Sequence, residues 1–127
     1  MDKPHTVRSL KVYQRAMDLV ETTYRVCEVF PKDERFELSS QIRRAAVSVP
    51  ANIAEGYGRW NMKELVRFLA IANGSLRELQ THFEIAKRLG YIQETRLTSL
   101  HRETDEIAAM IYALRARLSL RIEKNGS

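Results

Sequence analysis

The residues with the most chemical potential lie in one short stretch, residues 48–59, which reads Ser-Val-Pro-Ala-Asn-Ile-Ala-Glu-Gly-Tyr-Gly-Arg. Asn52 and Glu55 are three positions apart and Glu55 and Arg59 are four apart, so on a helix the three side chains share one face. They could bind a polar ligand, or they could form a buried hydrogen-bond and ion-pair network, which must be fully satisfied to be tolerated. We favour the structural network. Its candidate members are Arg43, Arg44, Asn52, Glu55, Arg59, Asn73 and Glu78.

Other side chains that could do chemistry form no recognisable catalytic set. The histidines His5, His82 and His101 fall on three different segments, and the paired Glu-x-x-His elements of di-iron bundles are missing. The glycines of Gly56-Tyr57-Gly58 follow a helical pattern, whereas the dinucleotide-binding fingerprint needs a preceding strand. The sequence therefore predicts no catalytic residue, no metal site and no cofactor, and a protein that is not an enzyme.

The composition is that of one globular domain over residues 1–127, with 44% hydrophobic and 29% charged residues. No apolar run approaches the roughly 20 residues that span a bilayer, and the polar start, residues 1–5, leads into no apolar signal core. The single cysteine, Cys27, excludes an internal disulfide and suits a reducing compartment. We expect a cytoplasmic protein with no membrane contact.

Apolar residues recur at steps of three and four along almost the whole chain, which is the period of amphipathic helices. This period predicts helices over about residues 8–30, 33–56, 61–89 and 93–123. No stretch alternates with period two, so we expect no sheet. Short connections between four helices predict an all-α, antiparallel up-down-up-down four-helix bundle.

Local signals define how these helices begin and end. Asp33 is a plausible N-cap for the second helix, and Asn61 with Glu64 three positions later forms a capping-box-like pair for the third. Pro50 lies inside the second helix, and the apolar period crosses it without a change of phase. A proline removes one backbone hydrogen bond there, so we expect a continuous helix that is kinked at Pro50 and ends at the following glycines.

The fourth helix carries more apolar surface than one bundle core should use. Beside a heptad-like seam, it has a second stripe of Ala108, Tyr112 and Ala116. This surplus is available for contact with another protein.

Basic residues gather at one end of the expected bundle. The net charges of residues 1–15, 56–67 and 113–127 are +3, +2 and +3, a total of +8. The whole protein has a net charge of +5, so the rest of the chain carries −3. The helix dipole favours cations at the end of the fourth helix but acids at the starts of the first and third. This end is therefore a candidate contact for a phosphate backbone or an acidic protein. The candidate nucleic-acid-binding residues are Lys3, Arg8, Lys11, Arg15, Arg59, Lys63, Arg67, Arg115, Arg117, Arg121 and Lys124.

A family resemblance rests on residues 38–56, which read LSSQIRRAAVSVPANIAEG, together with Phe-Pro-Lys-Asp-Glu at 30–34, Gly58-Arg59, and FLAIANGSLREL at 68–79. Over about residues 8–120 the chain resembles the 23S rRNA intervening-sequence protein family, also called four helix bundle proteins. Asn73 and Val49 depart slightly from the pattern. The resemblance implies a small bacterial cytosolic bundle that forms rings, often pentamers, with no established catalytic set. The related accessory protein of diversity-generating retroelements binds nucleic acid and reverse transcriptase through basic surface.

Together these observations predict a non-enzymatic, homo-oligomeric binding or scaffold module that contacts RNA or a ribonucleoprotein through its basic end. Its first partner would be itself, in a ring that could be a homopentamer. The alternative is a protein–protein interaction scaffold without affinity for nucleic acid. Whether the polar residues of 43–59 bind a ligand is left open by the sequence.

Overall fold

The computed structural model describes residues 6–125 and is all-helical over that range. It contains four α-helices: α1 (Lys11–Glu28), α2 (Leu38–Tyr57), α3 (Met62–Arg88) and α4 (Glu94–Asn125). Two short 3-10 helices, η1 (Val7–Ser9) and η2 (Lys32–Phe36), precede α1 and α2. No strand occurs among the described residues. The predicted all-α class with four helices is confirmed.

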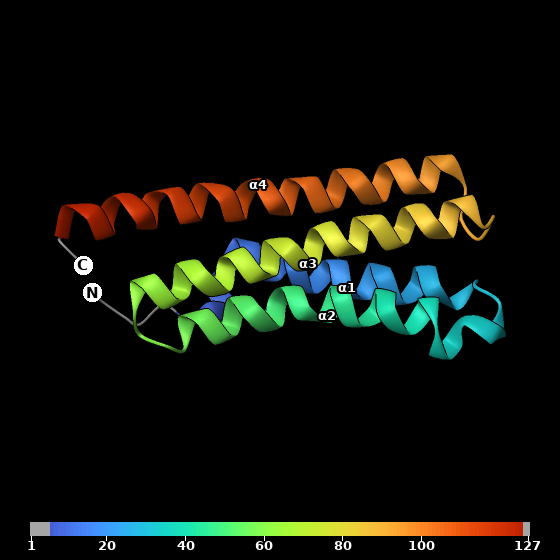
Figure 1. Cartoon of the computed structure of the whole chain (residues 1–127), viewed down its shortest axis with the longest axis horizontal. Helices are drawn as coiled ribbons and strands as arrows, with labels where there is room; N and C mark the ends of the chain where they lie inside the picture. The colour runs from blue at the N-terminus through green and yellow to red at the C-terminus, as the bar shows by residue number, and fades with distance from the viewer. Residues whose placement is uncertain (1–5, 126–127) are drawn as a thin grey trace.

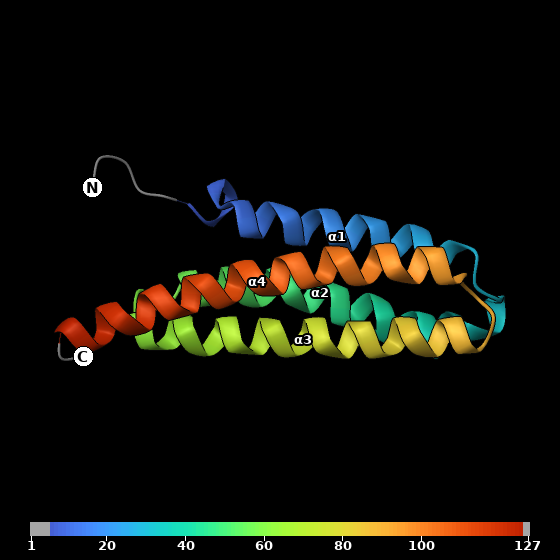
Figure 2. The ribbon, with the colours of Figure 1, turned by 90° about the horizontal axis from the view of Figure 1, so that it is seen from above.

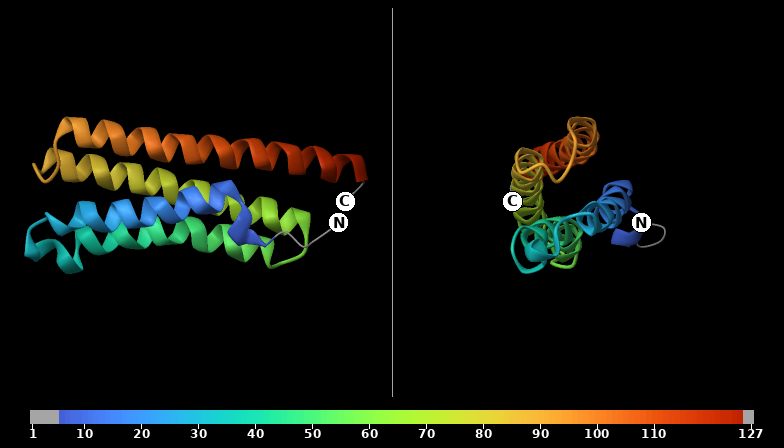
Figure 3. Two further views of the ribbon diagram at one scale, coloured as in Figure 1. Left: turned by 180° about the vertical axis from the view of Figure 1, so that it is seen from behind. Right: turned by 90° about the vertical axis from the view of Figure 1, so that its right-hand side faces the viewer.

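The helices lie side by side along one long axis, and consecutive helices run in opposite directions (Figure 1). The end-on view in Figure 3 shows α3 between α2 and α4, with α1 beside α2. The starts of α1 and α3 therefore lie at the same end of the molecule as the ends of α2 and α4. The last turns of α4 extend past the other three helices at that end (Figures 1 and 2).

The core runs along the inside of this arrangement and takes side chains from every helix. Leu19, Ile53, Phe83 and Ile107 are each fully buried, one from each of α1 to α4 in turn. Their burial supplies the main stabilising term, because each large apolar side chain removed from water contributes about 1.5–3 kcal/mol.

The start of α2 differs from the prediction. Residues 32–36 form a 3-10 helix, and α2 begins only at Leu38, after the non-helical backbone of Glu37 (φ −115°, ψ −107°). Asp33 does not cap α2. Instead, the Glu34 carboxylate accepts hydrogen bonds from the Leu38 backbone N–H (3.2 Å) and the Tyr91 hydroxyl (2.6 Å). The first predicted helix likewise begins later, because Leu10 is extended and separates η1 from α1.

Pro50 is buried inside α2, and the helix continues across it from Leu38 to Tyr57. The kink at Pro50 stays a prediction.

α2 ends at Tyr57 with Gly58 as its C-cap, so the predicted glycine stop holds for Gly58 and not for Gly56. Gly56 lies within α2, where a Cβ would come 2.9 Å from the Phe68 Cβ, so its missing side chain serves close helix packing. Gly58 keeps a right-handed backbone (φ −75°), and the left-handed residue is Trp60 (φ 56°). A non-glycine residue in that region costs about 1–2 kcal/mol. Asn61 caps α3 as predicted, accepting from the Glu64 backbone N–H at 3.0 Å.

Candidate nucleic-acid interface

The end of the bundle that holds the starts of α1 and α3 and the ends of α2 and α4 also holds the predicted cations. We call residues 6–15, 55–67 and 112–125 the basic end. Three of its arginines form ion pairs: Arg59 with Glu55 (2.8 Å), Arg67 with Glu64 (3.1 Å) and Arg15 with Glu106. The other seven predicted cations within residues 6–125 have no carboxylate within ion-pair distance. They are Arg8, Lys11, Lys63, Arg115, Arg117, Arg121 and Lys124. Lys3 lies outside the described residues.

Two of the paired arginines are held on one aromatic ring. The guanidinium carbons of Arg59 and Arg67 lie 5.2 Å and 4.5 Å from the centroid of Phe68, within the range of cation–π attraction. The hydrogen bond from Arg67, with the charges of Arg67 and Arg59, holds the pKa of Glu64 below its usual range. The ring and the carboxylates fix the positions of both guanidinium groups and neutralise part of their charge.

The cations of α4 lie on different sides of that helix. Arg117, Arg121 and Lys124 are exposed, whereas Arg115 is half-buried and its Nε is buried without a hydrogen-bond partner. Burial raises the pKa of Tyr57, at the end of α2, and the positive charge of Arg117 opposes that rise. Arg117, Arg121 and Lys124 therefore present the accessible positive charge of α4 at the basic end.

The predicted polar network is not assembled as one unit. Asn52 does not bond Glu55 or Arg59; its amide donates to the Ser48 carbonyl (2.8 Å) and to the Ser48 hydroxyl (2.9 Å). The Ser48 hydroxyl in turn contacts the Ser75 hydroxyl of α3 at 2.7 Å. This chain of bonds links α2 to α3, but through serines that were not among the predicted members.

The remaining predicted members lie apart. The Glu55–Arg59 pair has the predicted spacing but is about half exposed, so it is a surface pair and not a buried lock. Arg43 donates to the Arg35 carbonyl (3.1 Å), and Glu78 contacts His82 within α3 (3.3 Å). The two other members are Arg44, which is exposed on α2, and Asn73, which lines a cavity between α3 and α4 with Arg115.

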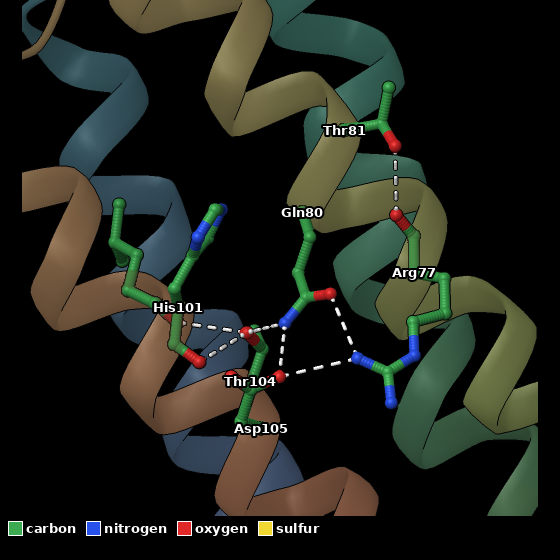
Figure 4. Close-up of polar contacts among 7 residues, drawn as sticks. Arg77, Gln80, Thr81, His101, Thr104 and Asp105 are labelled. Carbon is green, nitrogen blue, oxygen red and sulfur yellow. Dashed lines mark hydrogen bonds and ion pairs between the residues drawn. The ribbon is translucent and has the colours of Figure 1, made fainter.

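A second polar cluster, which was not predicted from the sequence, joins α3 to α4 (Figure 4). The Gln80 amide donates to the Thr104 hydroxyl (2.7 Å) and to the Asp105 carboxylate (2.8 Å), and Arg77 donates to Gln80 and Asp105. The bond from Gln80, followed by that from Arg77, lowers the pKa of Asp105. These four side chains bond one another across the interface, so the cluster is a helix–helix link without a free nucleophile. The sequence feature that could have indicated this cluster was Thr104, a polar residue within the apolar seam of α4.

Further features of residues 6–125 are the placement of the potential metal ligands, the single thiol and the length of the helices. No group of three or more potential metal ligands comes together among them. Cys27 is buried, and this burial raises the pKa of its thiol, which keeps it protonated and unreactive. No helix in this part of the chain is long and apolar enough to cross a membrane.

An apolar cavity of about 490 Å³ lies at the turn between α2 and α3, at the basic end. Its walls include Tyr57, Met62 and Leu65, and Trp60 forms part of its lining. Trp60 was not predicted as a site residue, although the chain has only one tryptophan and it directly follows Arg59.

Comparison with known proteins identifies the family but no activity. A family model described as 23S rRNA-intervening sequence protein matches residues 8–113, which confirms the resemblance seen in the sequence. A solved structure of a protein of unknown function from the S23 ribosomal protein family of Bacteroides thetaiotaomicron VPI-5482 superposes with a TM-score of 0.73. It is 21% identical and covers 82% of this chain and 97% of its own, so the likeness concerns the fold. None of the curated protein sequences compared matches the chain.

Proposed function

The chain belongs to the 23S rRNA-intervening sequence protein family, and we propose that it is a non-enzymatic, homo-oligomeric binding module that contacts RNA through its basic end. One observation carries the proposal. The basic end holds ten basic and three acidic residues, a net charge of +7, whereas the net charge of the whole protein is only +5.

The positions of these cations favour an external anion over an internal role. Lys11 and Lys63 lie in the first turns of α1 and α3, where the helix dipole would favour acids, so neither stabilises its own helix. Arg117, Arg121 and Lys124 are exposed on the C-terminal part of α4, and the last turns of that helix extend past the other three helices (Figure 1). A phosphate backbone would supply the anions that these cations lack. Each such contact would also add affinity, because it releases condensed counterions.

Self-association is supported by a separate surface on α4. Tyr112 and Leu120 are 72% and 67% exposed, and between and beside them lie exposed alanines on the same helix face. The α4 stripe, as we call it, comprises Ala109, Tyr112, Ala113, Ala116 and Leu120. It faces away from the buried Ile107, Ile111 and Leu118, and contiguous exposed apolar surface of this kind marks protein contacts.

We propose that copies of the chain associate through the α4 stripe into a ring in the bacterial cytoplasm. Five copies is the number that the family resemblance implies. A ring would repeat the basic end around its axis, so that weak phosphate contacts add as avidity. The same stripe could instead hold a different protein, which keeps a protein–protein scaffold without RNA affinity as the second candidate.

Charge reversal tests the RNA contact. In the variant Arg117→Glu/Arg121→Glu/Lys124→Glu, we expect binding to a structured RNA to be lost at about 0.05 M salt, where the parent binds best. The matched control Lys32→Glu/Arg88→Glu/Arg96→Glu makes the same charge change at the other end and should retain binding. Circular dichroism checks that both variants fold. If the parent protein does not bind the RNA at low salt, the RNA proposal is refuted and the protein–protein scaffold remains as the proposed function.

Sedimentation velocity tests assembly. Ala116→Gln places a bulky neutral side chain on the α4 stripe and should convert the assembled protein to monomer at micromolar concentration. Ala51→Gln makes the same change at an exposed alanine of α2 and should leave the sedimentation coefficient unchanged. A parent protein that sediments only as a monomer would remove the ring from the proposal.

A further inference from the structure

Trp60 is the most exposed large apolar side chain among the described residues, at 89%. It lies in the turn between α2 and α3 with a left-handed backbone (φ 56°), which bulky side chains rarely adopt. The indole therefore contributes almost no burial to the folded chain, although its backbone conformation is a costly one. Strained residues of this kind concentrate at binding sites.

The surroundings of Trp60 combine an apolar hollow with positive charge. The cavity of about 490 Å³ beside it is lined mainly by apolar side chains, with polar groups on Thr6, Tyr57 and Asn61. The guanidinium of Arg59 precedes the indole in the chain, Lys63 follows it in the first turn of α3, and the charge of Arg117 acts on Tyr57 in the cavity wall. A flat apolar face next to an apolar hollow and several cations fits a ligand that is both aromatic and anionic.

Resting on the RNA contact proposed above, we infer that Trp60 is a stacking platform for an unpaired base of single-stranded RNA, with the neighbouring cavity accommodating the base. The cations at this end then bind the phosphates on either side of that base. Unpaired bases of RNA stack on aromatic side chains in this way, whereas the bases of a duplex keep their faces inside the helix. Charge complementarity selects this occupant over an apolar protein segment, which would gain nothing from Lys63 or Arg117.

The chain's single tryptophan makes stacking directly observable. A single-stranded RNA of about ten nucleotides, within the range of known single-strand site sizes, should quench the intrinsic fluorescence of the parent protein at low salt. The same strand annealed to its complement should bind through the cations without comparable quenching. A mononucleotide supplies the base without a backbone, and it should quench only at far higher concentration.

Affinity for the single strand, measured by anisotropy of a labelled RNA, tests the side chain itself. Trp60→Ala should weaken binding about tenfold or more, while Trp60→Phe, which keeps an aromatic face, should retain most of the affinity. Phe36→Ala is the matched control, because Phe36 is 79% exposed at the opposite end of the bundle. It should bind like the parent. Circular dichroism confirms that all three variants fold.

The outcomes separate this inference from the function on which it rests. If Trp60→Ala binds the single strand like the parent and no quenching occurs, while the α4 charge reversal still abolishes binding, the stacking platform is refuted and the RNA contact stands. If the parent protein binds neither the structured RNA nor the single strand at low salt, both proposals fail. If tryptophan emission changes with protein concentration alone and Trp60→Ala dissociates the assembly, the occupant is a second copy of the chain, which also overturns the inference.

Discussion

Replacing Gly56 with alanine tests how closely α2 and α3 approach each other at the basic end. A Cβ at this position would lie 2.9 Å from the Phe68 Cβ and 3.0 Å from the Leu65 Cδ1. The Phe68 Cβ is fixed to the backbone of α3, so the contact is relieved only if the helices separate. Overpacking of this kind costs about 1–3 kcal/mol, and the better helix propensity of alanine returns about 1 kcal/mol. We expect the free energy of unfolding to fall by up to about 2 kcal/mol.

Gly74 provides the matched control, since it also lies inside a helix but a Cβ added there would have nothing within 4 Å. Gly74→Ala makes the same gain in helix propensity without any overlap, so the free energy of unfolding should rise by about 0.5–1 kcal/mol. The two substitutions are chemically identical, yet their effects on the free energy of unfolding should have opposite signs.

Urea denaturation followed by circular dichroism measures both values, at one fixed protein concentration because self-association raises apparent stability. A Gly56→Ala protein that gains as much stability as Gly74→Ala would refute the close approach of α2 and α3. If Gly74→Ala loses stability only in the assembled protein, a second copy must contact the exposed face of α3 at that position.

Three further predictions concern stability. Burial raises the pKa of Glu103, so the charged carboxylate lowers the stability of the folded protein above the unfolded-state pKa and has no effect below it. Glu103→Gln should therefore raise Tm at about pH 7 and leave it unchanged near pH 3. Equal gains at both pH values would contradict burial as the cause. Ser75→Ala removes the hydroxyl contact to Ser48 and should lower the free energy of unfolding by about 1 kcal/mol in urea denaturation, an effect that Ser99→Ala on the exposed surface should not reproduce. Trp60→Gly should raise the free energy of unfolding by about 0.5–1 kcal/mol, because glycine adopts left-handed backbone at no steric cost, and a loss would show that the indole stabilises the isolated chain.

Periodicity predicted the helices well because each one repeats its apolar residues over many turns. The cap at Asn61 was equally predictable, since its partner Glu64 is only three residues away. The start of α2 was not. Asp33 was the predicted cap, but the carboxylate that bonds the first turn of α2 belongs to Glu34. The Tyr91 hydroxyl, 57 positions further along the chain, also donates to that carboxylate, and local sequence cannot show this contact.

The polar residues of the second helix show a related limit. Spacing correctly placed Glu55 and Arg59 on one face, but it could not show that this face meets water. Asn52 instead bonds Ser48, which lies four residues earlier, and Ser48 reaches Ser75 across the helix interface. Helical spacing defines which residues are neighbours on one helix. The residue that each of them meets on another helix depends on packing.

Trp60 is where local rules and the fold disagree most. Two glycines precede it, and either could have reversed the chain at low cost. Gly58, however, remains right-handed because its N–H still bonds the carbonyls of Ala54 and Glu55 at the end of α2. Asn61 must be extended to cap α3 (φ −147°, ψ 121°), so the reversal falls on the residue between the helix end and the cap. Glycine or asparagine would fit there at lower cost, and an indole that is 89% exposed recovers almost none of that cost by burial within the chain. Within residues 6–125 the tryptophan therefore gains almost nothing from burial, which is why we assign binding to the strained turn at the basic end and not to the polar residues that precede it.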